Sequence, residues 1–135
     1  MTEPTGATRS STSGGVRLAW GALGTFLLAW DVFEMAKHQG WVIPGALVGA
    51  ALPLLPRLVG RGRAEAGRLP SGLVPAHNLL NRAAIPFGIM VVFTFLGDKP
   101  EDIAAPFTFG MAWLTGVALS RAAGFGLATP EGWQR

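Results

Sequence analysis

The arginines of this chain are distributed unevenly around four long apolar stretches. All nine arginines lie in the N-terminal arm, between Arg57 and Arg82, or from Arg121 to the end of the chain. The two lysines, Lys37 and Lys99, lie in the two remaining connectors. Cytoplasmic loops of membrane proteins carry an excess of positive residues, and this bias sets the orientation of the spans. The alternation therefore predicts a protein that crosses the membrane four times and keeps both ends in the cytoplasm.

The composition fits a membrane protein and excludes several other classes. Of the 135 residues, 50% are hydrophobic and 14% are charged, and the mean hydropathy is +0.38, which is typical of one compact membrane domain. The positive charge flanks the apolar stretches instead of forming a soluble basic face, so we expect no nucleic-acid partner. The chain has no cysteine, which excludes disulfides, thiolate metal sites and a cysteine nucleophile.

Each apolar stretch is close to the ~20 residues that a helix needs to cross ~30 Å of hydrocarbon. Because backbone groups in lipid must be satisfied within the segment, these stretches are expected to be helices. The predicted fold is all-α, a four-helix transmembrane bundle of residues 16–123 with spans at about 16–35, 41–59, 76–97 and 103–121. We expect residues 1–15, rich in Ser, Thr and Gly, to form a disordered cytoplasmic arm, and residues 124–135 to form a cytoplasmic tail.

Small residues and prolines recur within the predicted spans. Gly45 and Gly49 form a Gly-x-x-x-Gly pair in the second span. Such pairs let helix backbones approach closely, either within the bundle or across a homodimer interface. Prolines remove backbone donors and kink helices. Kinks are therefore expected at four positions, namely Pro44, Pro53, Pro56 and Pro86.

Ionisable side chains form an outer cluster near the outer end of the first span. Asp31, Glu34 and His38 share one helical face, with spacings of i, i+3 and i+7. Asp31 follows Arg17 by fourteen residues, which corresponds to ~21 Å along a helix and places it within the outer leaflet. An ionisable group at that depth normally faces the bundle interior or a water-filled cavity.

Three interpretations of the outer cluster are open. Asp31 and Glu34 can act as acid and base, with His38 as a polar contact, because a desolvated carboxyl can exchange protons with a substrate. The same groups can ligate a divalent metal, although we expect neither a metal nor a cofactor. Alternatively, the span ends near Trp30, and the carboxylates are hydrated beside an interfacial belt formed by Trp30 and Trp41.

A second, inner cluster lies at the inner end of the third span. Its members are His77, Asn78, Asn81 and Arg82, followed by Pro86. Asn78 and Arg82 share a helical face at i, i+4. The polar residues expected at the same membrane level on other spans are Arg57, Thr115, Ser120 and Arg121. Arginine and asparagine donors suit an anionic headgroup, such as that of a phospholipid or a polyprenyl phosphate. The alternative is positive-inside anchoring with amide hydrogen bonds between helices.

Two stretches of the second half resemble a known family. One is Asn78-Leu79 followed by Pro86, and the other is Arg121-Ala122-Ala123-Gly124-Phe125-Gly126-Leu127, which is similar to an Arg-x-x-Gly-aromatic-Gly-Leu ending. Together they resemble an uncharacterised bacterial family of small four-span integral membrane proteins, a domain of unknown function. The resemblance implies the same fold and orientation.

The chain departs from that family at its polar positions. The family tends to carry histidine or aspartate at places that here hold Asn81 or Arg82, Arg57, Thr115 and Ser120. These departures remove the set of residues best suited to metal binding or acid–base chemistry. The resemblance therefore implies a fold without implying a reaction.

Two functions are predicted from these observations. The first is a non-catalytic accessory subunit of a membrane complex or a binder of a lipidic ligand, because nucleotide-binding and hydrolase motifs are absent from the sequence. The alternative is an intramembrane enzyme acting on a lipidic or isoprenoid substrate, with Asp31 and Glu34 as acid and base and Arg82 orienting an anionic end. The expected location is the cell membrane. The expected partners are the lipid bilayer, a lipidic or isoprenoid ligand, and a membrane-protein partner or a second copy of the chain.

Overall fold

The computed structural model describes residues 14–62 and 68–133, and these ranges are mostly helical, with turns, short irregular segments and an isolated bridge between Arg68 and Trp133. The elements in chain order are α2 (Gly14–His38), α3 (Val42–Ala51), the 3₁₀ turn η1 (Leu52–Leu54), α4 (Leu55–Val59), the 3₁₀ turn η2 (Ser71–Leu73), α5 (Val74–Leu80), α6 (Ala84–Leu96) and α7 (Pro100–Ala122). The predicted all-α fold is confirmed. Residues 1–13 of the predicted arm lie outside the described residues, and residues 14–15 already belong to α2.

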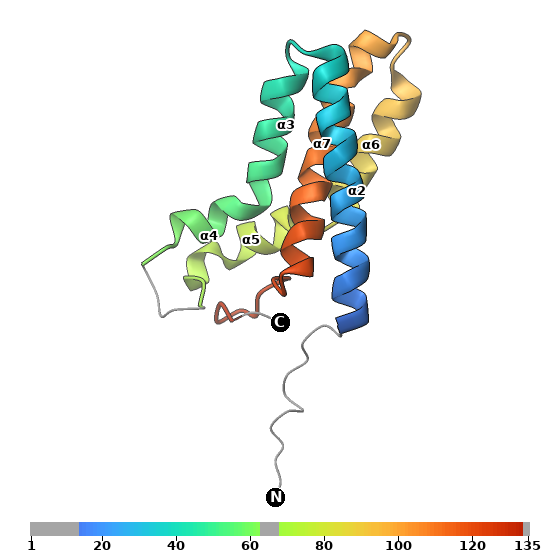
Figure 1. The fold of residues 1–135 in the computed structure, drawn as a ribbon. Helices are drawn as coiled ribbons and strands as arrows, with labels where there is room; N and C mark the ends of the chain where they lie inside the picture. The colour runs from blue at the N-terminus through green and yellow to red at the C-terminus, as the bar shows by residue number, and fades with distance from the viewer. Residues whose placement is uncertain (1–13, 63–67, 134–135) are drawn as a thin grey trace, which may run out of the picture.

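Four stretches are long and apolar enough to cross a membrane, namely Gly14–His38, Val42–Val59, Ser71–Leu96 and Pro100–Ala122. Their number agrees with the sequence prediction. We call the end of the bundle where α2 begins and α7 ends the terminal end (Figure 1). The loops that join α2 to α3 and α6 to α7 lie at the opposite end (Figure 1).

The central helix of the bundle is α7. Its neighbours α2, α3 and α6 each pack along it, whereas α2 contacts α3 at few positions (Figure 1). The core therefore follows α7, where Met111 is fully buried and contacts Leu27 of α2. The outer faces of the surrounding helices expose large apolar side chains, including Phe26 of α2 and Phe95 of α6. Such faces are suited to contact with lipid.

The second and third spans are each broken toward the terminal end. In the second, α3 is followed by η1 and α4, with Pro53 and Pro56 in the first turns of η1 and α4. In the third, α5 ends at Leu80 and α6 begins at Ala84. Figure 1 shows that α4 and α5 run across the bundle axis. Because α3 has 10 residues and α6 has 13, they rise only about 15 Å and 20 Å, so each of these two candidate spans is a bent pair of helices.

One of the four prolines differs in its effect from the sequence prediction. The predicted kinks at Pro53 and Pro56 coincide with the break between α3 and α4. The predicted kink at Pro86 coincides with the second break, because α5 ends at Leu80 and Pro86 lies in the first turn of α6. A proline removes the helical hydrogen bond to the carbonyl four residues earlier. Pro44 instead lies in the first turn of α3, where the missing N–H leaves no helical hydrogen bond unmade, so it does not bend its helix.

Glycines on α3 and α7 allow these two helices to lie in close contact. A Cβ added to Gly49 would meet the backbone oxygen of Phe109. A Cβ added to Gly116 would lie 2.8 Å from the backbone oxygen of Ala50. At Gly45 the same addition would meet its neighbours only at ordinary van der Waals distances. The packing role of the Gly-x-x-x-Gly pair therefore falls on Gly49, which α7 covers, and a homodimer remains a prediction.

Candidate functional site

The C-terminal segment, residues 123–133, folds back against α5. Asn78 pairs with the backbone of Ala128 in both directions: its Nδ2 donates to Ala128 O (3.0 Å), and its Oδ1 accepts from Ala128 N (2.6 Å). His77 Nε2 lies 2.9 Å from Gly126 O, and a carbonyl can only accept, so this nitrogen carries the hydrogen. These contacts attach the segment that the sequence predicts as a tail to the helical bundle.

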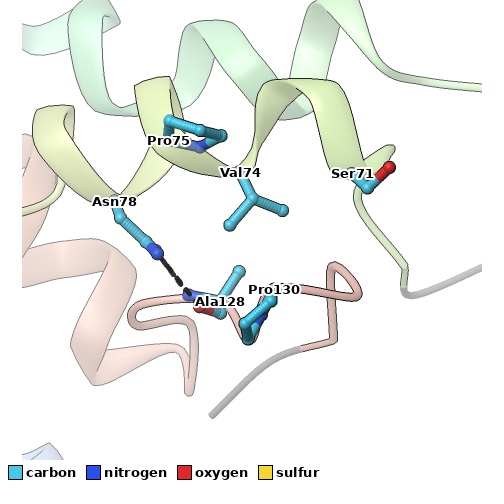
Figure 2. A pocket seen from close by; sticks show the side chains of 6 residues that line it. All are labelled: Ser71, Val74, Pro75, Asn78, Ala128 and Pro130. Atoms are coloured by element: carbon cyan, nitrogen blue, oxygen red, sulfur yellow. Dashed lines mark hydrogen bonds between the residues drawn. The ribbon is translucent and has the colours of Figure 1, made fainter.

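A shallow cavity lies between α5 and the C-terminal segment (Figure 2). Its volume is about 280 Å³, and it is lined by Ser71, Val74, Pro75, Asn78, Ala128 and Pro130. None of these six residues is charged. The Asn78 amide is already engaged by Ala128, as the dashed line in Figure 2 marks. The cavity therefore offers little with which to hold or transform a polar ligand.

Side chains of the inner cluster and of α7 satisfy the backbone carbonyls freed where the spans break. Asn81 Nδ2 donates to Pro53 O (2.9 Å). Trp113 Nε1 donates to Leu80 O (2.7 Å), and Arg121 Nη2 donates to Asn81 O (2.9 Å). Irregular backbone at membrane depth is tolerated where such groups find partners within the protein. The network therefore holds the two interrupted spans together.

Two arginines belong to this network. Arg57 Nη2 donates to Ser120 Oγ (3.1 Å), and its guanidinium carbon lies 4.3 Å from the centre of the Phe125 ring. The guanidinium carbon of Arg121 lies 5.1 Å from the centre of a Trp20 ring. Arg57 Nη1 and Arg121 Nε are buried and lack a hydrogen-bond partner among the described residues. Within residues 14–62 and 68–133, the one ion pair joins two other side chains, so neither guanidinium has a carboxylate partner there.

A second shallow depression, of about 360 Å³, lies at the terminal end between the start of α2 and the end of α7. It is lined by Gly14, Arg17, Leu18, Gly21 and Ala122. Arg17 Nε donates to Ala122 O (3.0 Å), and the Arg17 side chain is exposed. A third guanidinium therefore lies at the terminal end, open to the surroundings.

Arg82 lies elsewhere than the sequence analysis places it. It follows the end of α5 in the break before α6, and its side chain is exposed. The i, i+4 relation to Asn78 requires a continuous helix, which the break removes. Arg57 and Arg121 make the part-buried guanidinium contacts of this region instead. The headgroup contact that the sequence assigns to Arg82 is therefore proposed below for these two arginines.

The outer cluster separates into two groups. Asp31 is only 3% exposed, and its Oδ2 lies 2.6 Å from Thr115 Oγ1 on α7. Glu34 bonds within its own helix: one carboxylate oxygen lies 3.2 Å from His38 Nε2, and the other accepts from Trp30 Nε1 at 3.3 Å. The helix α2 continues past Trp30 to His38. Asp31 therefore faces the bundle interior, and the two carboxylates are engaged separately.

Among the described residues, the polar side chains do not assemble a metal site. In the part of the chain that the structure describes, no group of three His, Asp or Glu side chains is placed to hold a metal ion. His77 and His38 lie in different spans and are bonded separately, to Gly126 O and to Glu34. The proposal that follows therefore involves no metal.

The contact between Thr115 and Asp31 was missed by the sequence analysis. Thr115 precedes Arg121 by six residues, about 9 Å along a helix, which groups it with the inner cluster. The register between α2 and α7 brings it to Asp31 instead, since Gly24 lies directly against Leu119. The sequence does contain one sign of this contact: Thr115 is a hydroxyl residue within an apolar stretch, and such a hydroxyl needs a hydrogen-bond partner inside the bundle.

Comparison of the chain with protein families, with characterised proteins and with solved structures finds no match. The resemblance in the second half therefore remains a prediction. The function of the protein has to be inferred from its geometry.

Proposed function

We propose that this chain is a non-catalytic multi-pass protein of the cell membrane that binds an anionic lipidic ligand at its cytoplasmic end. The observation that carries the proposal is the pair of partly buried guanidiniums of Arg57 and Arg121, which have no carboxylate partner among the described residues. Both approach the same turn of α7, because Arg57 bonds to Ser120, the neighbour of Arg121.

The physical reason is the cost of leaving these groups unpaired. Arginine keeps its positive charge inside a protein. Each buried N–H without an acceptor costs about 1–3 kcal/mol, and Arg57 Nη1 and Arg121 Nε are two such groups. A phosphate oxygen supplies both an acceptor and a negative charge in one charge-assisted hydrogen bond. An anionic headgroup would therefore supply the acceptors that these N–H groups lack and the negative charge that the two guanidiniums lack.

The distribution of charge at the two ends of the bundle supports a lipid in the cytoplasmic leaflet as the source of that phosphate. The described arginines lie on or beside the elements at the terminal end, namely Arg17, Arg57, Arg61, Arg68, Arg82 and Arg121. Lys37 and Lys99 lie toward the opposite end. An arginine excess marks the cytoplasmic side, and the cytoplasmic leaflet carries the anionic phospholipids.

Both termini are accordingly expected in the cytoplasm. The chain has no cysteine, so single cysteines can be introduced at two exposed positions, Lys99→Cys between α6 and α7 and Arg61→Cys after α4. A membrane-impermeant maleimide added to intact cells should label Lys99→Cys. It should reach Arg61→Cys only after the membrane is opened. The opposite labelling pattern would reverse the proposed orientation.

A double variant, Arg57→Gln/Arg121→Gln, is expected to lose its response to anionic lipid. Glutamine keeps a polar side chain but removes the charge and the planar fork that grips two oxygens. A ligand that binds only the folded state raises the free energy of unfolding by RT ln(1 + [L]/Kd) and so raises the melting temperature. Phosphatidylglycerol added to the detergent-purified wild type should therefore raise the melting temperature, and the rise should be several times smaller in the variant.

Matched controls separate this site from general effects of lipid. Arg61→Gln/Arg82→Gln removes two exposed arginines from the same end and should keep the response to phosphatidylglycerol. Phosphatidylcholine should stabilise the wild type less, because its headgroup has no net charge. Equal responses of the two double variants, or equal effects of the two lipids, would contradict the proposal. A shift produced by inorganic phosphate alone would identify the ligand as a free anion instead of a lipid.

An intramembrane enzyme receives less support from the same geometry. That hypothesis assigns Asp31 and Glu34 as a cooperating acid and base, but Asp31 bonds to Thr115 inside the bundle and Glu34 bonds to His38 and Trp30. A role as an accessory subunit also remains a prediction, because the exposed apolar faces of α2, α3 and α6 suit lipid as well as a protein partner.

A further inference from the structure

The buried carboxyl of Asp31 makes a hydrogen-bonded chain into α7. Asp31 Oδ2 lies 2.6 Å from Thr115 Oγ1, and Thr115 Oγ1 lies 2.8 Å from Met111 O. Thr115 is only 3% exposed, and Met111 is fully buried. Both distances lie within the usual range of O–H···O hydrogen bonds. Each of the two contacts therefore needs one hydrogen.

The number of hydrogens available depends on the state of Asp31. A threonine hydroxyl supplies one hydrogen, a backbone carbonyl supplies none, and an ionised carboxylate supplies none. With Asp31 ionised, the single Thr115 hydroxyl hydrogen can be donated either to Asp31 Oδ2 or to Met111 O, but not to both. The contact left without a hydrogen would then place two acceptor oxygens only 2.6–2.8 Å apart. With Asp31 protonated, its O–H donates to Thr115 and the Thr115 hydroxyl donates to Met111 O. Both contacts are then satisfied.

The charges on the surrounding elements agree with a neutral carboxyl. The helices α3 and α6 carry no charged residue, and α7 carries none between Asp102 and Arg121. On α2 the nearest basic groups, Lys37 and His38, lie beyond Asp31 toward the opposite end, where Lys37 stacks on Phe33 and His38 bonds to Glu34. The other Asp31 oxygen, Oδ1, is buried without a partner among the described residues. A buried carboxyl without a counter-ion normally takes up a proton.

We propose that Asp31 is held as a neutral carboxylic acid inside the bundle, so that the chain carries a bound proton within its membrane-spanning region. The proton lies between Asp31 Oδ2 and Thr115 Oγ1. This inference is independent of the anionic lipid, because Asp31 lies in the outer half of the first span and Arg57 and Arg121 lie at the terminal end. A neutral Asp31 can donate a proton but cannot accept one, so it is not available as a resident base.

Infrared spectroscopy of an isotope-labelled protein tests the proposal directly. The chain contains three aspartates, Asp31, Asp98 and Asp102, and the last two are exposed. In the variant Asp98→Asn/Asp102→Asn, made by cell-free synthesis with carboxyl-¹³C aspartate and placed in lipid nanodiscs, Asp31 is the only aspartate. At neutral pH the label should shift the carbonyl stretch of a protonated carboxyl. A shift confined to the symmetric and antisymmetric carboxylate stretches would overturn the proposal.

Thermal stability gives a second readout with isosteric variants. Asp31→Asn supplies an N–H where the acid supplies an O–H, so it should melt close to the wild type, whereas Asp31→Ala should melt clearly lower. Thr115→Val removes the hydroxyl at nearly constant volume and should also melt lower, and Thr115→Ser should recover most of the loss. If Asp31→Asn melts at as low a temperature as Asp31→Ala, the proposal that Asp31 is a neutral acid is wrong.

Discussion

Gly49→Ala is expected to destabilise the protein by about 1–3 kcal/mol, the usual cost of forcing extra volume into a packed interior. The added methyl would meet the backbone oxygen of Phe109 and lie 3.2 Å from the backbone nitrogen of Trp113. Backbone atoms of a central helix cannot move aside as a flexible side chain can, so α3 would have to separate from α7. Chemical or thermal unfolding in detergent measures the loss as a lower melting temperature.

Gly45→Ala is the matched control, because it adds the same methyl group one helical turn away on the same helix. At Gly45 the nearest atom would be the Ala105 oxygen at 3.6 Å, and the Phe109 Cβ would follow at 3.9 Å. Both are ordinary contacts, and alanine favours a helix over glycine. Gly45→Ala should therefore be neutral or slightly stabilising. Equal loss in the two variants would mean that the close contact between α3 and α7 is not formed.

Asn78→Leu is expected to release the C-terminal segment from α5. The variant leaves the N–H and C=O of buried Ala128 without their partners, at about 1–3 kcal/mol for each group. The two groups together cost about 2–6 kcal/mol, and each 1.4 kcal/mol is a factor of ten. Amide exchange around Ala128 should therefore accelerate by at least about thirtyfold. Hydrogen–deuterium exchange read by mass spectrometry measures this for the C-terminal peptide.

Ser71→Ala provides the control for that experiment, because Ser71 lines the same cavity and is exposed. It should leave the exchange of the C-terminal peptide unchanged. If Asn78→Leu also leaves it unchanged, the segment is held by other contacts, such as that between His77 and Gly126. The double variant His77→Leu/Asn78→Leu then decides whether α5 holds the segment at all.

The apolar stretches could be predicted from the sequence because length and composition determine which segments can cross a membrane. The sites of the breaks could be predicted only in part. Pro53 and Pro56 mark one break and Pro86 follows the other, but both breaks also depend on partners for the freed carbonyls. One such partner, Trp113, lies 33 residues away along the chain. Periodicity within one span carries no information about such a partner.

The sequence predicts the inner cluster better than the outer cluster. Arg57, Asn78, Asn81 and Arg121 were selected because polar groups near lipid need partners, and they do lie in one network. Three of the four bond to backbone carbonyls, namely those of Asn81, Pro53 and Ala128, and Arg57 bonds to the Ser120 hydroxyl. A pattern of residue types cannot reveal which carbonyl a side chain will reach. Asp31 and Glu34 share a helical face in the sequence, yet the packing of α7 takes only Asp31 into the interior.

The central claim is that Arg57 and Arg121 bind an anionic lipid, and native mass spectrometry of the intact protein tests it most directly. The wild type and the two double variants are released from the cell membrane in the same mild detergent, and the masses of retained lipids are measured. We expect the wild type and Arg61→Gln/Arg82→Gln to retain an anionic phospholipid, and Arg57→Gln/Arg121→Gln to lose it. Retention of the same lipid by all three proteins, or retention of none by the wild type, would contradict the claim.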